Sequence, residues 1–340
     1  LLINLNIPLS RDIFFDRLIK SQSLVLTEDL NLIGSDKKNL DHSNIEYLGC
    51  VYSSDKWENR NIELADFKIN TPADGWLYYK IYLGSGKHHC ELIESLANLI
   101  SDQNDELCKW FFIIYNDDGY HVRFRIKCSS TRRAVISSKI DTFLSELIEL
   151  REVLSFQTDL YIPELGRYGE KTIDLAEEIF YLDSVFCVNN KSLDDLKYAI
   201  FSIHFYFQSF SVKLEKRIIL LDRLFRNFAS RLALGKNEYK KINNVFRENR
   251  LNVDVFLAKE FKSLVKSFTS IESTSPFRIE HMSIENEDQF ITSVIHMSMN
   301  RRFGTNANVH EIIYYDLMMK YYQSELRRNA KAVDSQKSNQ

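Results

Sequence analysis

The stretch KWFFIIYNDDGYHVRFRIK, residues 109–127, decides the fold because it contains two strand patterns joined by a tight turn. Residues 109–115 form an apolar run with the length of a buried strand, and NDDGY has the composition of a hairpin turn. In residues 121–127 polar and apolar side chains alternate, so His121, Arg123 and Arg125 share one face. The stretch therefore predicts an antiparallel hairpin with one basic face.

The segments on either side extend this hairpin into a small α+β unit. WLYYKIYL (76–83) predicts a strand and residues 88–103 a helix before the hairpin. Residues 129–153 predict an amphipathic helix, and FQTDLYIP (156–163) predicts a further strand. The order strand–helix–strand–strand–helix–strand is typical of a two-layer unit with an antiparallel sheet.

The second half of the chain has helical periodicity, with apolar residues three and four positions apart. The fold class predicted for the whole chain is therefore α+β, an antiparallel two-layer unit followed by a mostly helical half. The segments with this period are 172–186, 193–210, 214–232, 253–268, 287–299 and 308–328. The expected domains are a strand–helix and connecting segment (1–73), the main domain (74–328) and a polar, disordered tail (329–340).

Composition limits the class of protein. The 340 residues are 44% hydrophobic and 27% charged, which suits a globular protein, and the net charge of −3 gives no global field for nucleic acid. Five scattered cysteines predict reduced thiols in a cytoplasmic protein, and no apolar run is long enough for a membrane span. No His/Cys spacing indicates a metal, and no motif indicates a cofactor. The start lacks a signal peptide and an initiator Met, which predicts a processed or excised chain.

Three motifs carry candidate chemistry, and each also has a structural explanation. Arg123 and Arg125 on one strand face can clamp carboxylates or a developing negative charge, but alternating arginines also occur on solvated faces. In PELGRYG (163–169) a stiff turn presents Arg167 with Glu164 as its partner, or the pair only fastens a connection. In IHMSMNRRFG (295–304) His296 lies beside arginines and suits proton transfer, although a helical histidine is commonly a core residue.

The order of the motifs resembles a known family. WLYYKIYL, WFFIIYNDDGYHVRFRI, TDLYIPELGRYGE, AEEIFYLDS and IHMSMNRRFG together resemble the C-terminal elimination domain of class I lanthipeptide dehydratases, over residues 74–328. The same domain occurs alone in split lanthipeptide and thiopeptide pathways. The resemblance implies a lyase that expels glutamate from glutamylated Ser or Thr of a precursor peptide and leaves dehydroalanine or dehydrobutyrine. No cofactor is implied.

The resemblance also implies partners and site residues. A separate domain or protein would glutamylate the peptide from glutamyl-tRNA, and a cyclase complex and a homodimer are further expected partners. His296 would transfer the proton, Arg125 and Arg167 would hold the glutamyl group and the enolate, and Glu164 would orient Arg167. The family turn ends RYGG, whereas this one ends RYGE. The candidate catalytic residues are Arg123, Arg125, Glu164, Arg167, His296 and Arg301.

Two other functions stay open on the sequence alone. Related thiopeptide enzymes with the same fold join two dehydroalanines in a cycloaddition. A non-catalytic module that binds the leader peptide or scaffolds a biosynthetic complex is the other alternative. The presence of the whole Arg–Arg–Glu–Arg–His set favours elimination over both.

Overall fold

The computed structural model describes residues 69–84, 89–101, 108–117, 119–232, 234–271 and 286–337. Most of the segment 1–73, for which a strand, a helix and a connection are predicted, lies outside the described residues. Within the described ranges, every helix is too short or too polar to cross a membrane.

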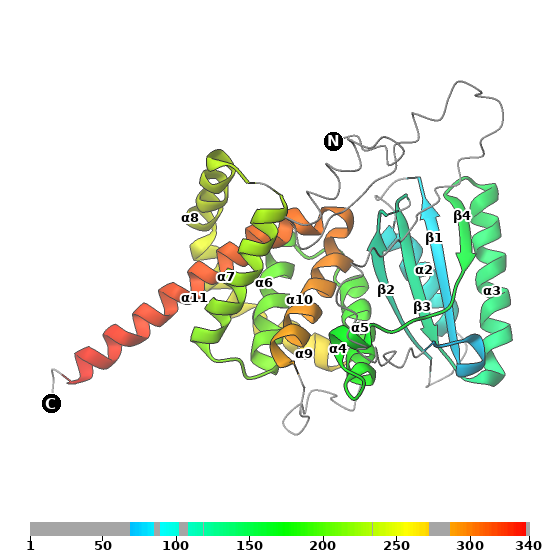
Figure 1. Cartoon of the computed structure of the whole chain (residues 1–340), viewed down its shortest axis with the longest axis horizontal. Coiled ribbons are helices and arrows are strands. Elements are labelled where there is room, and N and C mark those ends of the chain that lie inside the picture. Colours follow the sequence, from blue (N-terminus) through cyan, green and yellow to red (C-terminus); the bar gives the residue numbers. More distant parts are fainter. Residues whose placement is uncertain are drawn as a thin grey trace, which may run out of the picture. The chain divides into compact units, whose positions relative to one another are not determined.

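The predicted hairpin and the α+β fold class are confirmed (Figure 1). The four strands β1 (Trp76–Leu83), β2 (Lys109–Tyr115), β3 (His121–Lys127) and β4 (Val153–Thr158) form a sheet with the order β2-β3-β1-β4. The strand pairs are antiparallel, and Arg125 of β3 lies between Tyr78 of β1 and Phe111 of β2. The register therefore places Arg125 beside an aromatic residue of each neighbouring strand, whereas Arg123 lies between Lys80 and Ile113.

One face of the sheet forms the core of the first layer. Tyr79, Phe112 and Phe124 are fully buried on this face. Helices α2 (His89–Ser101) and α3 (Ser130–Glu149) cover it, and the Tyr79 hydroxyl lies 3.0 Å from Ser137 Oγ of α3. Burying each large apolar side chain stabilises the fold by roughly 1.5–3 kcal/mol. The apolar face is thus committed to the core, and the basic side chains point to the opposite face.

The last strand differs from the prediction. Helix α3 ends at Glu149, and Arg151 adopts a left-handed conformation (φ 61°) that stops it. Strand β4 therefore begins at Val153, and only its end overlaps the expected strand 156–163. Residues 159–163, here called the strap, continue as extended chain. The strap is held by two backbone hydrogen bonds between Asn70 and Tyr161, of 2.8 and 3.1 Å, and by a third from the Asp159 N–H to the Tyr78 carbonyl, of 3.0 Å.

The remaining chain is helical, as predicted, with changed boundaries. Helix α8 begins well before the expected residue 253, because its polar first half lacks the apolar period, and a break at Glu260 separates it from α9. Helix α11 continues to Lys337, so residues 329–337, expected as a disordered tail, are helical. The helices are α4 (Leu165–Tyr168), α5 (Ile173–Asn189), α6 (Asp195–Ser209), α7 (Leu214–Arg231), α8 (Lys236–Lys259), α9 (Phe261–Thr269), α10 (Glu287–Phe303) and α11 (Ala307–Lys337).

The helical half is joined to the sheet along the edge strand β2. Ser184 of α5 accepts a hydrogen bond from the Phe112 backbone (3.3 Å), and Glu178 of α5 pairs with Lys109 at 2.5 Å. Asn300 of α10 binds both the N–H and the C=O of Ile114, at 2.8 and 2.9 Å. These contacts fix α5 and α10 beside the basic face of the sheet.

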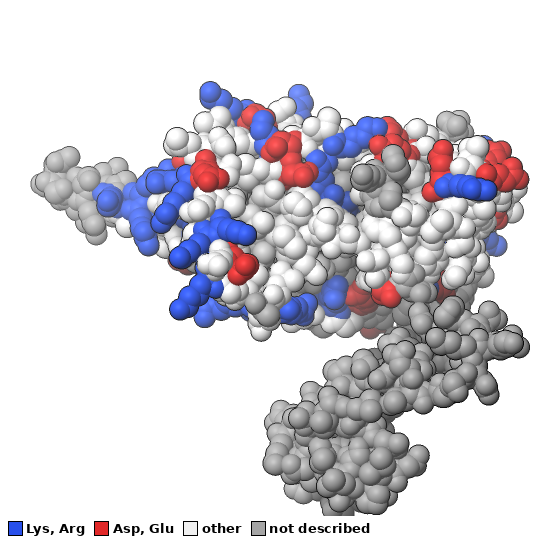
Figure 2. Space-filling view, turned by 90° about the horizontal axis from the view of Figure 1, so that it is seen from above, with Lys and Arg blue, Asp and Glu red and all other residues white. Residues whose placement is uncertain are grey.

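Surface charge is uneven despite the small net charge of the chain. Figure 2 shows Lys and Arg side chains gathered at the end of the molecule where α8 and the C-terminal part of α11 lie. Helix α8 contributes exposed Lys236, Lys240, Lys241, Arg247 and Arg250. This concentration lies in the helical half, apart from the basic face of the sheet.

Candidate active site

Arg125 occupies an aromatic box on the second face of the sheet. Its guanidinium carbon lies 4.7 Å from the ring centre of Tyr78, 5.0 Å from that of Tyr161 and 5.5 Å from that of Phe111. The residue is only 9% exposed, and its buried Nε has no hydrogen-bond partner among the described residues. Aromatic faces stabilise a cation but accept no directed hydrogen bond of ordinary strength, so Nε lacks the acceptor that a buried N–H needs.

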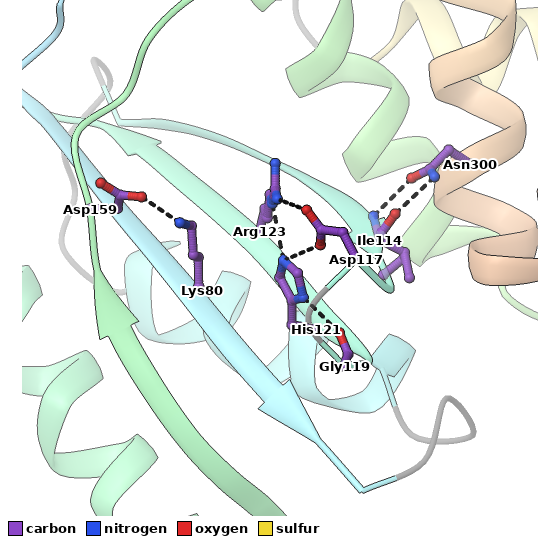
Figure 3. Close-up of polar contacts among 8 residues, drawn as sticks. All are labelled: Lys80, Ile114, Asp117, Gly119, His121, Arg123, Asp159 and Asn300. Carbon is purple, nitrogen blue, oxygen red and sulfur yellow. Dashed lines mark hydrogen bonds and ion pairs between the residues drawn. The ribbon is translucent and has the colours of Figure 1, made fainter. Parts of the chain in front are cut away.

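Arg123 lies two residues earlier on the same face and is held more firmly. Its guanidinium lies 3.6 Å above the Tyr115 ring, and Nη2 donates to Asp117 Oδ2 at 2.8 Å. Nε donates to His121 Nε2 at 3.0 Å, as Figure 3 shows. Nη1 has no hydrogen-bond partner within the described part of the chain and can bind a ligand.

Lys80 of β1 completes this face, which we call the basic face (Lys80, Arg123 and Arg125). Lys80 pairs with Asp159 of the strap at 2.5 Å, and this pair is also drawn in Figure 3. Burial raises the pKa of Tyr78 against the lowering effect of the Arg125 and Arg123 charges. Tyr78 therefore stays protonated at neutral pH, and the face presents cations and a phenol rather than a phenolate.

The glycine-rich turn brings Glu164 and Arg167 together, as predicted. Arg167 Nε lies 3.1 Å from Glu164 Oε2 across the single turn of α4. Burial lowers the pKa of Arg167, but the Glu164 carboxylate together with the phenols of Tyr168 and Tyr115 outweighs this effect, so the pKa is raised. Gly169 ends the turn at φ 78°, where an added Cβ would lie 2.7 Å from Thr172 Oγ1.

Electrostatics link Arg167 to the basic face. The phenol of Tyr115, on which Arg123 stacks, is among the groups that raise the pKa of Arg167. Burial and the Glu164 carboxylate raise the pKa of Tyr168, while the charges of Arg167 and Arg301 act against them. Arg167 thus lies close enough to Tyr115 for the two groups to interact electrostatically, and Tyr115 in turn contacts Arg123.

His296 belongs to a buried carboxylate dyad in the helical half. Its Nδ1 lies 2.7 Å from Oε1 of Glu311, which is 0% exposed, and the Tyr315 hydroxyl donates to the same oxygen at 2.6 Å. Burial and the Glu311 carboxylate raise the pKa of Tyr315 well above its usual value, so Tyr315 remains a donor. The His296 side chain is 32% exposed. The dyad fixes the ring, and Nε2, which has no hydrogen-bond partner among the described residues, is available for proton transfer.

The structure links His296 to the basic face only through its helix. Among the described residues, no hydrogen bond, ion pair or ring contact joins His296 to Arg123, Arg125 or Arg167. Asn300, which binds the end of β2, is one turn farther along the same side of α10. Helix geometry therefore places His296 about 6 Å along the axis of α10 from the contact between Asn300 and β2. We predict that His296 and the basic face meet the same substrate.

Arg301 is buried away from solvent. Its Nη1 lies 2.8 Å from Asp183 Oδ2, its guanidinium carbon lies 5.0 Å from the Phe180 ring centre, and the residue is 1% exposed. Ser298 and Tyr206 donate to the other Asp183 oxygen at 2.8 and 2.9 Å. Nε and Nη2 of Arg301 are buried without a hydrogen-bond partner among the described residues, but its ion pair with Asp183 favours a structural role in which it ties α10 to α5.

Asp183→Asn should lower the free energy of unfolding by about 3–5 kcal/mol, because it leaves the buried Arg301 cation uncompensated. Asp254→Asn is a suitable control, since Asp254 pairs with Arg328 at 3.3 Å where both side chains are partly exposed. Loss of that pair should cost about 0–1 kcal/mol. Urea unfolding measures both, and equal midpoints for the two variants would contradict the structural role.

Several site residues were not found from the sequence. Tyr161 was assigned to a strand, yet it reaches across the face from the strap and covers Arg125. Glu311 lies fifteen positions beyond His296, across the break at Gly304, so no helical spacing connects them. Its only sequence signal is a carboxylate directly before the apolar run IIYY of its helix, which indicates a partly buried position.

Comparison with known proteins identifies a family whose model covers most of the described helices and strands. A family model described as "Lantibiotic biosynthesis dehydratase C-term" matches residues 76–322. The nisin biosynthesis protein NisB of Lactococcus lactis subsp. lactis is 27% identical over 266 residues, which cover 75% of this chain and 26% of NisB. The subtilin biosynthesis protein SpaB of Bacillus subtilis is 23% identical over 261 residues, which cover 71% of this chain and 25% of SpaB. The chain thus spans about a quarter of the length of these relatives.

A solved structure has a similar fold. It is the tRNA-dependent lantibiotic dehydratase MibB from Microbispora sp. 107891, with a TM-score of 0.51 and 16% identity. The similarity covers 75% of this chain and 28% of MibB. At this identity the likeness concerns the fold alone.

Proposed function

The chain belongs to the family of lantibiotic biosynthesis dehydratase C-terminal domains, and from this premise we propose that it eliminates glutamate from glutamylated Ser or Thr of a precursor peptide. The products are glutamate and dehydroalanine or dehydrobutyrine. The chain would receive its substrate from a separate tRNA-dependent glutamylation domain or protein in the cytoplasm. It would therefore act as a carbon–oxygen lyase that catalyses the second step of a dehydration, after glutamylation.

The observation that carries this proposal is the unpartnered Nε of Arg125 in its aromatic box. Burying a cation without a hydrogen-bond acceptor is costly. Arg301 also has unpartnered buried nitrogens, but it forms an ion pair with Asp183, whereas Arg125 has no carboxylate partner among the described residues and can take one from a ligand. Arg123 lies on the same face of the sheet as Arg125, and Arg167 interacts electrostatically with Tyr115, on which Arg123 stacks. A ligand with more than one anionic oxygen fits this arrangement, and a glutamyl ester with its free side-chain carboxylate provides it.

The proposed step removes the Cα proton of the modified residue and breaks its Cβ–O bond. The electron pair of the Cα–H bond forms an enolate, then the Cα=Cβ double bond, and the carboxylate of glutamate leaves with the Cβ–O pair. Arg125 and Arg167 would stabilise the enolate oxygen and the leaving carboxylate. His296 Nε2 would accept the Cα proton, and Glu311 would stabilise the resulting imidazolium through Nδ1–H.

Mass spectrometry of a synthetic peptide tests the proposal directly. Incubation of the whole chain with a peptide that carries O-glutamyl-Ser should give dehydroalanine and free glutamate without tRNA or ATP. The same peptide with unmodified Ser should remain unchanged. A cognate glutamyl peptide that loses no glutamate would reject elimination, and release of a pyridine-containing macrocycle would instead support the cycloaddition alternative.

A further inference from the structure

His121 of β3 is a buried histidine to which the proposed reaction gives no role. It is 1% exposed and lies between the rings of Tyr82 and Tyr115, with centroid distances of 4.9 and 6.0 Å. Both ring nitrogens are engaged. Nδ1 donates to the Gly119 carbonyl at 2.8 Å, and Nε2 accepts from Arg123 Nε at 3.0 Å.

These two hydrogen bonds determine the protonation state of the ring. A carbonyl oxygen only accepts, so the proton lies on Nδ1, and an arginine Nε only donates, so Nε2 carries a lone pair. His121 is therefore neutral while it holds Arg123. The Asp117 carboxylate lies 3.6 Å from the same Nε2. Both groups accept from the Arg123 guanidinium, His121 from Nε–H and Asp117 from Nη2–H.

The two acceptors constrain Arg123 to different degrees. Asp117 is 56% exposed, and an exposed ion pair contributes little and yields readily to a competing anion. His121 is fixed by its backbone bond and by ring packing, so its Nε2 cannot move with the ligand. Together with the Tyr115 ring it sets the plane of the guanidinium. Figure 3 shows the contacts of Arg123 with His121 and Asp117, which leave Nη1 out of both hydrogen bonds.

We propose that His121 is a positioning residue that aligns Arg123 for the anionic substrate. It acts as a neutral acceptor and takes no part in proton transfer. The proposal rests on the proposed function in one respect, because the aligned guanidinium needs an anion to bind. The contact itself can be tested without turnover.

His121→Phe keeps an aromatic ring between Tyr82 and Tyr115 but removes the acceptor. We expect this variant to lower kcat/KM for the glutamyl peptide roughly tenfold or more, which is the usual effect of losing a hydrogen bond to a charged group. His121→Gln places an amide oxygen near the former Nε2 and should restore kcat/KM to within about threefold of the original. Equal melting temperatures of the two variants separate positioning from folding.

A double-variant comparison decides whether the effect passes through Arg123. In an Arg123→Gln background, His121→Phe should cause no further loss, because the residue that His121 aligns is already absent. An equal loss in both backgrounds would overturn the proposal, as would unchanged kinetics of His121→Phe. Asp117→Asn should change kcat/KM less than His121→Phe.

A spectroscopic measurement on the whole 15N-labelled chain keeps this test separate from that of the proposed function. The His121 signals, identified by their loss in His121→Phe, should show a protonated Nδ1 and an unprotonated Nε2 near neutral pH. Arg123→Gln should shift the Nε2 resonance. Protonation at Nε2, or no shift in the variant, would refute the contact even if elimination is observed. The expected spectrum without glutamate release would reject the proposed function alone.

Discussion

His296→Ala is expected to lower the rate of glutamate release by about 10²- to 10⁴-fold, the usual contribution of a general base, while the protein remains folded. The side chain is 32% exposed, so removing it creates no closed cavity in the core. The reaction should stop before elimination, and unreacted glutamyl peptide should accumulate in the mass spectrum.

The dyad explains why His296 suits this role. Glu311 is fully buried, and its Oε1 receives hydrogen bonds from both Nδ1 of His296 and the Tyr315 hydroxyl. A fixed carboxylate at Nδ1 orients the ring and stabilises the imidazolium that forms when Nε2 takes a proton. Glu311→Gln keeps the shape of the side chain and removes its charge, so it should lower the rate less than His296→Ala does. In the double variant, Glu311→Gln should cause no further loss beyond that of His296→Ala.

His310→Gln provides the matched control for this experiment. His310 precedes Glu311 on α11, but its ring stacks on Phe303 with a centroid distance of 4.2 Å and has no place in the dyad. Its variant should release glutamate at close to the original rate. A His296→Ala protein as active as His310→Gln would remove His296 from the mechanism.

The sequence predicted those parts of the fold that depend on local periodicity. Strand alternation in β3 placed Arg123 and Arg125 on one face, and the structure confirms that they share it. The pattern failed where chain direction depends on tertiary contacts. DLYIP alternates like a strand, yet only Tyr161 forms a bridge, with Asn70, and the rest crosses the basic face as the strap. The polar start of α8 likewise carried no apolar period.

The candidate site was predicted as a set of residues but not as an arrangement. Motif spacing joined Glu164 to Arg167, and the ion pair at 3.1 Å agrees with it. Spacing alone did not distinguish Arg301, which forms an ion pair with the buried Asp183, from Arg125, which has no carboxylate partner among the described residues. That difference depends on which buried guanidinium meets a carboxylate, and the carboxylate comes from another helix.

Arg125→Lys should lower kcat/KM for elimination by about 10²- to 10³-fold, as does the loss of one donor to a developing oxyanion. An ammonium group lacks the planar fork and cannot present two parallel N–H groups to a carboxylate or enolate. It would also remain buried among the rings of Tyr78, Phe111 and Tyr161, where its hydration is lost.

Stability distinguishes a functional role of Arg125 from a structural one. A buried cation without a full set of acceptors costs free energy in the unliganded protein, so Arg125→Met should leave the melting temperature unchanged or raise it while elimination is lost. If Arg125 were structural, the same substitution would lower the melting temperature and the activity together.

Lys127→Gln is the matched control, because Lys127 is the next residue on the same side of β3 and is 48% exposed, 3.9 Å from Glu177. Loss of this surface charge should change kcat/KM by less than about threefold. A comparable loss in Lys127→Gln would mean that general positive charge on the strand attracts the substrate. Normal turnover by Arg125→Lys would show that no forked contact forms at this position.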